Sequence, residues 1–268
     1  MRPARQTRYA LAHDLDDWKT DPRIAERGFA HRWDSIVEDG NGEDFFLELL
    51  DRHLRPGLDV LDVGCGHGPL ALKLAGTVRS VVGVERNAGY LSLAGELLAE
   101  SGLANVRFVR AELDERHGGS LPLPDQSVDL VVDRRGPTLD RFIDDLRRVA
   151  RPGAVIVGMH PAGTAPRPSW AVSIPSLASR FASMDYAEVA GWVTAPLTRH
   201  GISDFRLWWI DVPEYLCSAR ALYDRLRDDQ ATPWPTGTAE IEAAFAAGQH
   251  DGAVVLRHIR LVWTARLP

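Results

Sequence analysis

The sequence predicts an α/β fold with a doubly wound, mostly parallel sheet. Five short runs of nearly continuous apolar residues recur between residues 58 and 159, and helical periodicity fills most of the intervals between them. Parallel strands read as continuous apolar runs because helices cover both of their faces. Strands that alternate with helices in this way indicate βαβ units. A length of 268 residues accommodates either one large α/β domain or a domain with an accessory piece.

Apolar spacing predicts the elements of the first 160 residues. In one segment, for example, Leu139, Phe142, Ile143 and Leu146 follow the i, i+3, i+4, i+7 spacing of a helix. The predicted strands are Leu58–Val63, Ser80–Val84, Val106–Val109, Val128–Val132 and Ala154–Met159. The predicted helices are Glu43–Leu54, Pro69–Ala75, Gly89–Leu103 and Leu139–Ala150.

The pattern changes at Pro161, where several prolines fall within a short interval. Beyond it, apolar periodicity predicts three further helices and two further extended runs, which complete a set of seven strands. In chain order these elements are a helix over 185–200, a strand over 205–212, a helix over 214–227, a short helix over 239–247 and a strand over 254–263.

Composition excludes several classes of protein. Asp plus Glu is 37 and Lys plus Arg is 31, which gives a formal net charge of −6, and the sequence pI is about 5.8. Such a chain lacks the broad basic surface of nucleic-acid-binding proteins, although a local basic cleft is compatible with it. No apolar run approaches the roughly 18 to 20 residues that cross a bilayer, and no apolar block follows the first arginines. Extended nucleic-acid binding is therefore disfavoured, and we expect no membrane association and no signal peptide.

Cys65 and Cys217 are the two cysteines of the chain. Two cysteines cannot make a disulfide framework or a four-thiolate zinc site. We therefore expect a cytoplasmic protein with reduced thiols and no metal. We interpret the Cys65 side chain as a small buried residue rather than a nucleophile.

A glycine-rich turn follows the first predicted strand, in the segment Val60-Leu61-Asp62-Val63-Gly64-Cys65-Gly66-His67-Gly68. Glycines can adopt positive φ and let the backbone approach a ligand, and the start of the next helix favours an anionic group. Asp62 could meet a ligand ammonium or order the turn. Glu85 ends the next strand, where a carboxylate could accept both hydroxyls of a ribose. A plain tight turn is the alternative, and the two carboxylates favour ligand binding over it.

The spacing of the glycines separates two kinds of nucleotide site. A dinucleotide-binding domain would also have an acidic residue about 20 residues after the turn, so Glu85 does not decide between them. The turn here reads G-x-G-x-G through Gly64, Gly66 and Gly68, and Pro69 occupies the position of the third glycine of G-x-G-x-x-G. A nicotinamide-dependent oxidoreductase is therefore disfavoured.

The segment from about Trp33 to Met159 resembles the class I S-adenosylmethionine-dependent methyltransferases. Residues 62–68 look like the first motif of that family, Glu85 its ribose-binding acid, and residues 108–112 the segment whose acid lies beside the adenine. The segment 121–132 is similar to the family's approach to its fourth strand. The segment 146–154, Leu-Arg-Arg-Val-Ala-Arg-Pro-Gly-Ala, resembles the helix and turn before the fifth strand. Five matches in the expected order make the resemblance specific.

The resemblance implies a Rossmann-like sheet of seven strands, mostly parallel, with an antiparallel strand in the last pair and a helical lid. It also implies S-adenosyl-L-methionine as cofactor and S-adenosyl-L-homocysteine as product. The implied domain organisation is an N-terminal helical cover over 1–40, a cofactor-binding core over 41–163, and lid helices with the last two strands over 164–268, in one structural domain. The cofactor-binding residues that it implies are Asp62, Gly64, Cys65, Gly66, Gly68, Glu85, Arg86, Glu112, Leu113 and Asp133.

The chain departs from the family pattern in two places. The connection over 113–120 is longer than usual. The fourth strand ends in Asp133-Arg134-Arg135-Gly136-Pro137 rather than the Asn-Pro-Pro-Tyr type of sequence that many nucleic-acid and protein amino-group methylases have. Methylation of an adenine amine is therefore less expected, and the resemblance does not identify an acceptor.

Three residues are predicted to lie on the acceptor side as catalytic candidates. Asp133 ends the fourth strand, where open α/β sheets bind ligands, although it could instead cap the next helix. Arg134 would suit a carboxylate or phosphate of the substrate, with a surface ion pair as the alternative. His160 follows the fifth strand and could take a proton from a hydroxyl group, with a packed core histidine as the alternative.

The function expected from these observations is methylation of an oxygen or nitrogen of a small-molecule acceptor. RNA methylation is an alternative on the same fold, and a non-catalytic S-adenosylmethionine-binding protein is an alternative of a different class. A homodimer is left open, because no motif bears on it.

Overall fold

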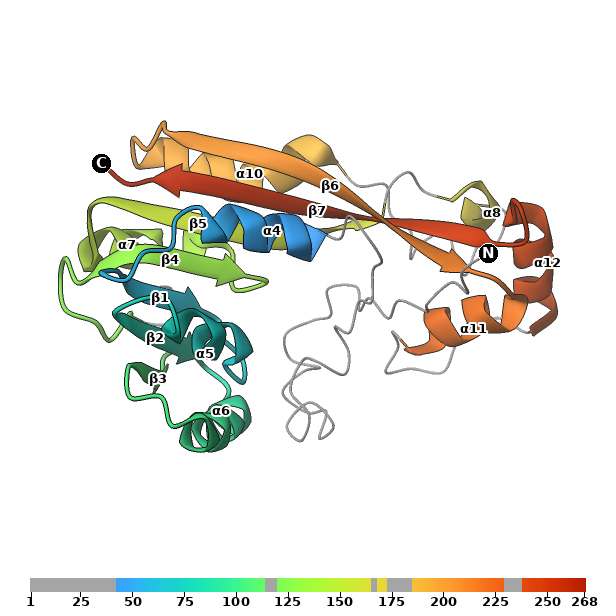
Figure 1. Ribbon diagram of the computed structural model, residues 1–268. Helices are drawn as coiled ribbons and strands as arrows, with labels where there is room; N and C mark the ends of the chain where they lie inside the picture. The colour runs from blue at the N-terminus through green and yellow to red at the C-terminus, as the bar shows by residue number, and fades with distance from the viewer. Residues whose placement is uncertain (1–41, 114–119, 165–167, 173–184, 229–237) are drawn as a thin grey trace.

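Seven strands form one sheet in the order β3-β2-β1-β4-β5-β7-β6 (Figure 1). The computed structural model describes residues 42–113, 120–164, 168–172, 185–228 and 238–268. The strands are β1 (Asp59–Val63), β2 (Ser80–Glu85), β3 (Val106–Arg110), β4 (Val128–Arg134), β5 (Ala150–Thr164), β6 (Phe205–Leu216) and β7 (Val254–Arg266). The helices are α4 (Gly42–Asp51), α5 (Pro69–Ala75), α6 (Ala88–Ser101), α7 (Ile143–Val149), α8 (Ser169–Val172), α10 (Tyr186–Arg199), α11 (Ala219–Asp228), α12 (Thr238–Gly248) and the 3₁₀ helix η2 (Leu139–Arg141).

The chain reverses its direction of winding between β1 and β4. From β1 it proceeds through β2 to β3 on one side, and β4 and β5 lie on the other side, all parallel to β1. β7 is antiparallel to both β5 and β6. This arrangement confirms the mostly parallel, seven-stranded sheet. In open α/β sheets, ligands bind beyond the carboxyl ends of the strands at such a switch point.

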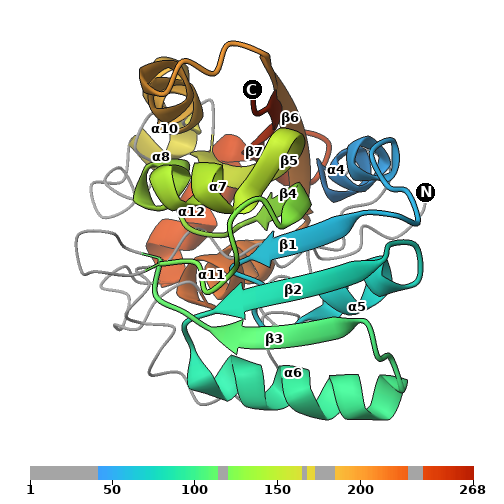
Figure 2. The same ribbon diagram turned by 90° about the vertical axis from the view of Figure 1, so that its left-hand side faces the viewer.

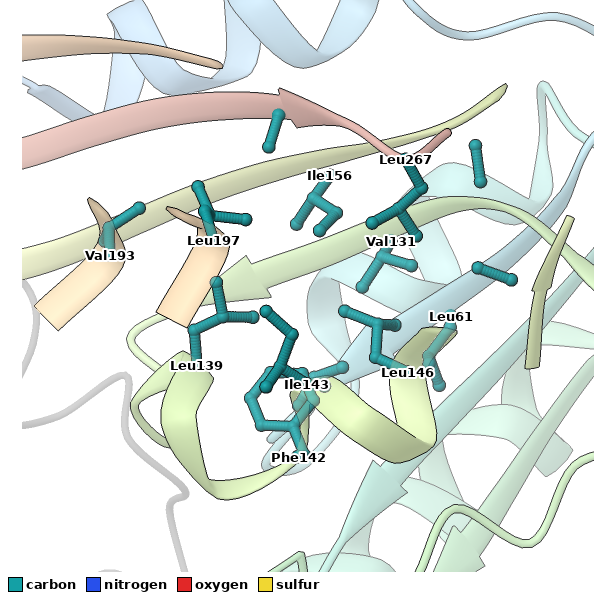
Figure 3. Close-up of a cluster of buried hydrophobic side chains, with 14 of the residues drawn as sticks. Leu61, Val131, Leu139, Phe142, Ile143, Leu146, Ile156, Val193, Leu197 and Leu267 are labelled. Carbon is teal, nitrogen blue, oxygen red and sulfur yellow. The ribbon is translucent and has the colours of Figure 1, made fainter. Parts of the chain in front are cut away.

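Helices cover both faces of the sheet. On one face, α7 and α10 bury apolar side chains such as Leu146, Val193 and Leu197 against Val131 and Ile156 (Figures 2 and 3). On the other face, α4 and α5 bury side chains that include Phe46, Leu50, Leu70 and Leu74 against β1, β4 and β5. Both faces of the central strands are therefore shielded from water, which explains their continuous apolar sequences. Among the described residues, no helix combines the length and apolar character that crossing a membrane requires.

The strands β6 and β7 pair antiparallel, and the chain between them forms α11 and α12; we call the two paired strands the β6–β7 hairpin. This hairpin extends beyond the carboxyl ends of β1 and β4 and carries a third apolar cluster (Figure 1). Leu216, Val254 and Leu256 of the hairpin pack there with α8, α11 and α12. We call this group, made of the two strand ends and the three helices, the hairpin lobe.

Three predicted elements differ from the structure. β5 continues past Met159 to Thr164, through a bulge between Pro161 and Gly163 that accommodates the missing N–H of proline. The segment Glu214–Leu216, predicted as the start of a helix, belongs to β6, because its backbone pairs with β7 and the side chains of Glu214 and Leu216 are buried there. The helix predicted over 139–150 is broken at Phe142 into η2 and α7. The predicted N-terminal cover over 1–40 lies outside the described residues.

Gly158 of β5 lies directly beneath the ring of Trp263 on β7. A Cβ atom at Gly158 would overlap the indole ring, and Trp263 is completely buried. We expect Gly158→Ala to lower the free energy of unfolding by about 2 to 3 kcal/mol, because overpacking a filled core forces neighbouring side chains to move. Denaturant unfolding measures the change. Gly95→Ala is the control, since nothing lies within 4 Å of that position in α6, and it should leave stability unchanged or slightly raised. Equal stability of the Gly158→Ala variant and the wild type would contradict this packing.

Candidate functional site

Three glycines form the turn between β1 and α5. Gly64, Gly66 and Gly68 have φ values of 66°, 58° and 82°, a left-handed conformation that disfavours other residues. A Cβ atom at Gly68 would also overlap the ring of Phe108 on β3, and one at Gly83 would lie 2.6 Å from the same ring. Phe108 therefore fixes how closely the turn approaches β2. From the apolar pattern, Phe108 was predicted only as a strand residue. Its contact with Gly68 and Gly83 depends on the position of β3 next to β2 in the sheet.

The Glu85 carboxylate connects the glycine turn after β1 to the turn that follows β2. Its Oε2 atom accepts a hydrogen bond from the Gly66 N–H at 3.0 Å, and its Oε1 atom accepts from Arg86 and Asn87 N–H groups, both at 2.9 Å. Burial raises the pKa of Glu85, and these three N–H groups together with the Arg86 charge oppose that rise. The carboxylate is thus held at the carboxyl ends of β1 and β2 by the backbone of both turns. Asn87 also caps α6 with its side chain.

Asp62 lies on β1 beside the turn and is almost completely buried. Burial raises the pKa of Asp62 to about 7; the Arg134 charge opposes the rise, and the charges of Asp133 and Glu85 add to it. Its Oδ2 atom has no hydrogen-bond partner within the part of the chain that the structure describes. A buried carboxylate oxygen without a partner is a suitable acceptor for a ligand ammonium.

Cys65 points into the interior of the turn. Burial raises the pKa of the thiol, and the nearby carboxylates of Asp62 and Glu85 raise it further. The sulfur lies 3.7 Å from the carbonyl oxygen of Gly66. The thiol therefore stays protonated and fills space, since the thiolate is the nucleophilic form.

The segment after β3 lies next to Glu85. The Ala111 N–H donates to the Glu85 carbonyl oxygen at 3.1 Å, and the following residue, Glu112, has an exposed side chain. Leu113, in contrast, packs its side chain into the core on the α7 side. Glu112, the residue assigned to the adenine, therefore presents its side chain, whereas Leu113, a predicted cofactor-binding residue, can present only its backbone.

Asp133 and His160 come together within the sheet. Asp133 lies one residue before the end of β4, as predicted, whereas His160 lies inside β5, which continues to Thr164; both side chains are at most 4% exposed. His160 Nε2 is 3.4 Å from Asp133 Oδ2, and the imidazole stacks on Trp263 with ring centroids 6.1 Å apart. In the described part of the chain, neither Asp133 oxygen nor His160 Nε2 has a hydrogen-bond partner. Thr138, rather than Asp133, occupies the cap position of η2.

Arg134 points to the opposite face of β4 from Asp133, the face that carries Asp62. Burial lowers the pKa of Arg134, and the Asp62 charge opposes this effect. Burial is the larger cause that lowers the pKa of His67, and the positive charge of Arg134 lowers it further. The structure therefore places Arg134 beside the glycine turn.

The sequence analysis missed a buried polar group on the β6–β7 hairpin. His258 Nε2 lies 2.7 Å from Glu214 Oε2, and both residues and Arg260 are 1% exposed. By register they share the sheet face of Arg134, between Val262 of the core and Leu256 of the hairpin lobe. Polar residues at alternate positions 258 and 260, on the strand face that also carries Leu256 and Val262, were the available signal. Within the described ranges, no group of three or more His, Cys, Asp or Glu side chains could hold a metal ion.

A glycine turn and a buried, backbone-anchored carboxylate at a switch point define a nucleotide-binding α/β domain. Comparison with known proteins gives the family. Residues 60–153 match the family described as "Methyltransferase domain". The chain is 34% identical over 147 residues to the "Probable S-adenosylmethionine-dependent methyltransferase" of Mycolicibacterium smegmatis, which is 52% of this chain and 48% of that protein. It is 34% identical over 122 residues to the arsenite methyltransferase of Halobacterium salinarum, 43% of this chain and 30% of that protein.

Other likenesses are shorter or concern the fold alone. The chain is 48% identical over 64 residues to the 23S rRNA (uracil(1939)-C(5))-methyltransferase RlmD of Stenotrophomonas maltophilia, 23% of this chain and 14% of that protein. A functionally unknown protein from Deinococcus radiodurans superposes with a TM-score of 0.61 at 20% identity, covering 92% of this chain and 98% of that chain. The YcgJ protein from Bacillus subtilis gives a TM-score of 0.55 at 18% identity, with coverages of 84% and 98%.

Residues 60–153 are thus similar to the methyltransferase-domain family and to an S-adenosylmethionine-dependent methyltransferase. The resemblance seen in the sequence is confirmed, and the family implies S-adenosylmethionine as cofactor. The chain spans about half or less of the length of these curated relatives.

Proposed function

We propose that the chain transfers a methyl group from S-adenosylmethionine to an oxygen or nitrogen of a small molecule. The observation that carries this proposal is the pair of buried carboxylates at the switch point. Glu85 is anchored by three backbone N–H groups, and Asp62 beside it keeps one buried oxygen without a partner among the described residues. One carboxylate suits a ribose and the other suits an ammonium, and the cofactor has both.

The residues present fit the cofactor. Glu85 would accept hydrogen bonds from the ribose hydroxyls, Asp62 would bind the ammonium, and the turn of Gly64, Gly66 and Gly68 leaves room for close approach. Glu112 and the Leu113 backbone would flank the adenine. When bound, the cofactor supplies a methyl group on a positively charged sulfur and leaves as S-adenosylhomocysteine. The task of the protein is then to orient the acceptor, exclude water and accept a proton.

His160 is the proposed proton acceptor for a hydroxyl group. Asp133, 3.4 Å from Nε2, would hold the proton on that nitrogen and leave Nδ1 to receive the acceptor's proton. Trp263, stacked on the ring, would hold its orientation. In this scheme His160 is a catalytic residue and Asp133 and Trp263 are positioning residues; Arg134, on the opposite face of β4 beside Asp62, has no part in the proton transfer.

A small acceptor is favoured over RNA by charge. The chain carries a net charge of −6, whereas RNA binding relies on many cationic contacts to phosphates. The likeness to RlmD spans only 64 residues and therefore carries no information on the acceptor.

Methyl-labelled S-adenosylmethionine tests the proposal. The purified chain is incubated separately with a metabolite extract, bulk RNA and a protein fraction, and label is expected in the metabolite fraction alone. His160→Ala should then lower turnover at least about 100-fold and Asp133→Asn about tenfold, because a general base contributes factors of this size. His250→Ala, a change at an exposed histidine, is the control.

Three outcomes would contradict parts of the proposal. Label in RNA would replace the small-molecule acceptor. Full turnover by both the His160 and Asp133 variants would remove their assigned roles. Binding of the cofactor with no transfer to any fraction would indicate a non-catalytic binding protein.

A further inference from the structure

A cavity lies at the amino ends of the strands, at the opposite end of β4 from Asp133. Its volume is about 150 Å³. Asp129, on its wall, precedes Asp133 by four residues of one strand, so the cavity is roughly 13 Å from the region of the cofactor turn. The lining residues come from the turn after α4, from β4 and β5, and from the end of β7: His53, Arg55, Leu58, Asp129, Leu130, Pro152, Gly153, Ala154, Val155 and Arg266.

The one acidic side chain of this lining is already neutralised. Asp129 Oδ2 accepts hydrogen bonds from the Asp59 N–H at 2.9 Å and from Arg151 Nη1 at 2.7 Å. Asp59 in turn pairs with Arg79 and with Arg151, and the Arg79 hydrogen bond is the main cause that holds the pKa of Asp59 well below its usual range. Two carboxylates are thus matched by two arginines, and this network adds no net charge to the cavity.

The remaining charges on the lining are positive. Arg266 donates to the Gly153 carbonyl oxygen at 3.1 Å and lies 3.6 Å from the exposed Asp204. The Arg55 carbonyl oxygen accepts a hydrogen bond from the Leu58 N–H at 3.2 Å, whereas the Arg55 side chain makes no hydrogen bond or ion pair with any residue that the structure describes. His53 is half-buried between these groups, and burial followed by the charges of Arg266, Arg55 and Arg52 lowers its pKa. A neutral imidazole can still donate one N–H to an anion.

The floor of the cavity is apolar and its size is limited. Leu130 and Val155, which are 1% and 8% exposed, lie there with Leu58. Drug-sized ligands occupy pockets of roughly 300 to 1,000 Å³, so this cavity suits only a compact molecule. From the cationic rim and the small volume we infer that the cavity is a binding site for a compact oxyanion, held by charge-assisted hydrogen bonds from Arg55 and Arg266. Inorganic phosphate and a short-chain carboxylate share this chemistry, and the apolar floor gives the carboxylate an additional contact.

Calorimetric titration of the full chain with three probes at constant ionic strength tests the site. The probes are inorganic phosphate, butyrate and butyramide, the last being a neutral analogue of butyrate. We expect saturable binding of an anion in the millimolar range and at least tenfold weaker binding of butyramide. The tighter of the two anions identifies the source of the ligand, with butyrate indicating use of the apolar floor.

Arg55→Gln and Arg52→Gln form a matched pair of variants. Both remove one positive charge near His53, but only Arg55 lines the cavity. Arg55→Gln should weaken anion binding at least tenfold, Arg266→Gln should weaken it similarly, and Arg52→Gln should change it less than twofold. S-adenosylhomocysteine binding by the same samples should be unchanged, which verifies folding and separates this site from the cofactor site.

Three results would overturn the inference. Equal weakening by Arg55→Gln and Arg52→Gln would show that anions respond only to the general surface charge. Equal affinity for butyrate and butyramide would show an apolar pocket without anion recognition. No saturable binding of either anion by the wild-type chain would exclude the site outright.

Discussion

Glu85→Ala should weaken binding of S-adenosylhomocysteine by at least about 100-fold. Hydrogen bonds to a charged group contribute about 1.5 to 3 kcal/mol each, so loss of two ribose contacts costs about 3 to 6 kcal/mol. The substitution also removes the acceptor of the Gly66, Arg86 and Asn87 N–H groups, and the glycine turn loses its link to β2. Calorimetric titration with S-adenosylmethionine, S-adenosylhomocysteine and NAD measures the effect and the choice of cofactor.

Glu100→Ala is the matched control for this change, since Glu100 is an exposed carboxylate in α6. It should bind S-adenosylhomocysteine as the wild type does. An unchanged affinity of the Glu85→Ala variant would remove the ribose assignment. Binding of NAD alone would show that this chain differs from its family in cofactor.

The second large effect concerns Asp62 and pH. Its pKa is raised to about 7 in the folded protein from an ordinary value of 3.8. Between these two values the folded state holds a proton that the unfolded state has released, so stability falls as pH rises through this window. From pH 5 to pH 8 the loss is about 2 to 3 kcal/mol. Asp62→Asn should lack this loss, and the difference between the two unfolding curves isolates it from other titrating groups.

The Asp62 carboxyl group should also make cofactor binding depend on pH, and in the opposite direction: affinity should rise with pH, whereas stability falls. An ammonium beside Asp62 favours the ionised carboxylate, so binding of S-adenosylhomocysteine by the wild type should release a proton near pH 7. Affinity should therefore rise about tenfold from pH 6 to pH 8, as the ionised fraction of a group with a pKa near 7 rises. The Asp62→Asn variant should bind weakly at both values. An identical pH dependence in the variant and the wild type would assign the effect to another group.

The parallel half of the sheet was predictable because its signal is local. Continuous apolar runs require burial on both faces, and helices on both faces provide it. The hairpin was less predictable, because the segment Glu214–Leu216 has the composition of a helix start and is fixed as strand by its pairing with β7. Tertiary pairing decides such segments, and local propensity does not.

The site residues also fall into two groups: those that a local sequence pattern marks and those that only tertiary pairing brings together. Asp62, the glycines and Glu85 lie within two consecutive strand ends, so their spacing in the sequence marks them. Asp133 and His160 meet because β4 and β5 are neighbours; the strand end predicted before His160 was wrong, because β5 continues to Thr164. Glu214 and His258 are 44 positions apart, and only the register of β6 with β7 brings them to 2.7 Å.

The hairpin lobe has a consequence for how this protein can diverge. Its apolar cluster is built from α8, α11, α12 and the far ends of β6 and β7, whereas the cofactor turn is built from β1, β2 and β3. Substitutions in one cluster therefore leave the packing of the other largely intact, since residues that share no contacts contribute independently to stability. Natural variation, or an experimental chimera, can exchange the hairpin lobe while the half that holds Asp62 and Glu85 stays constant.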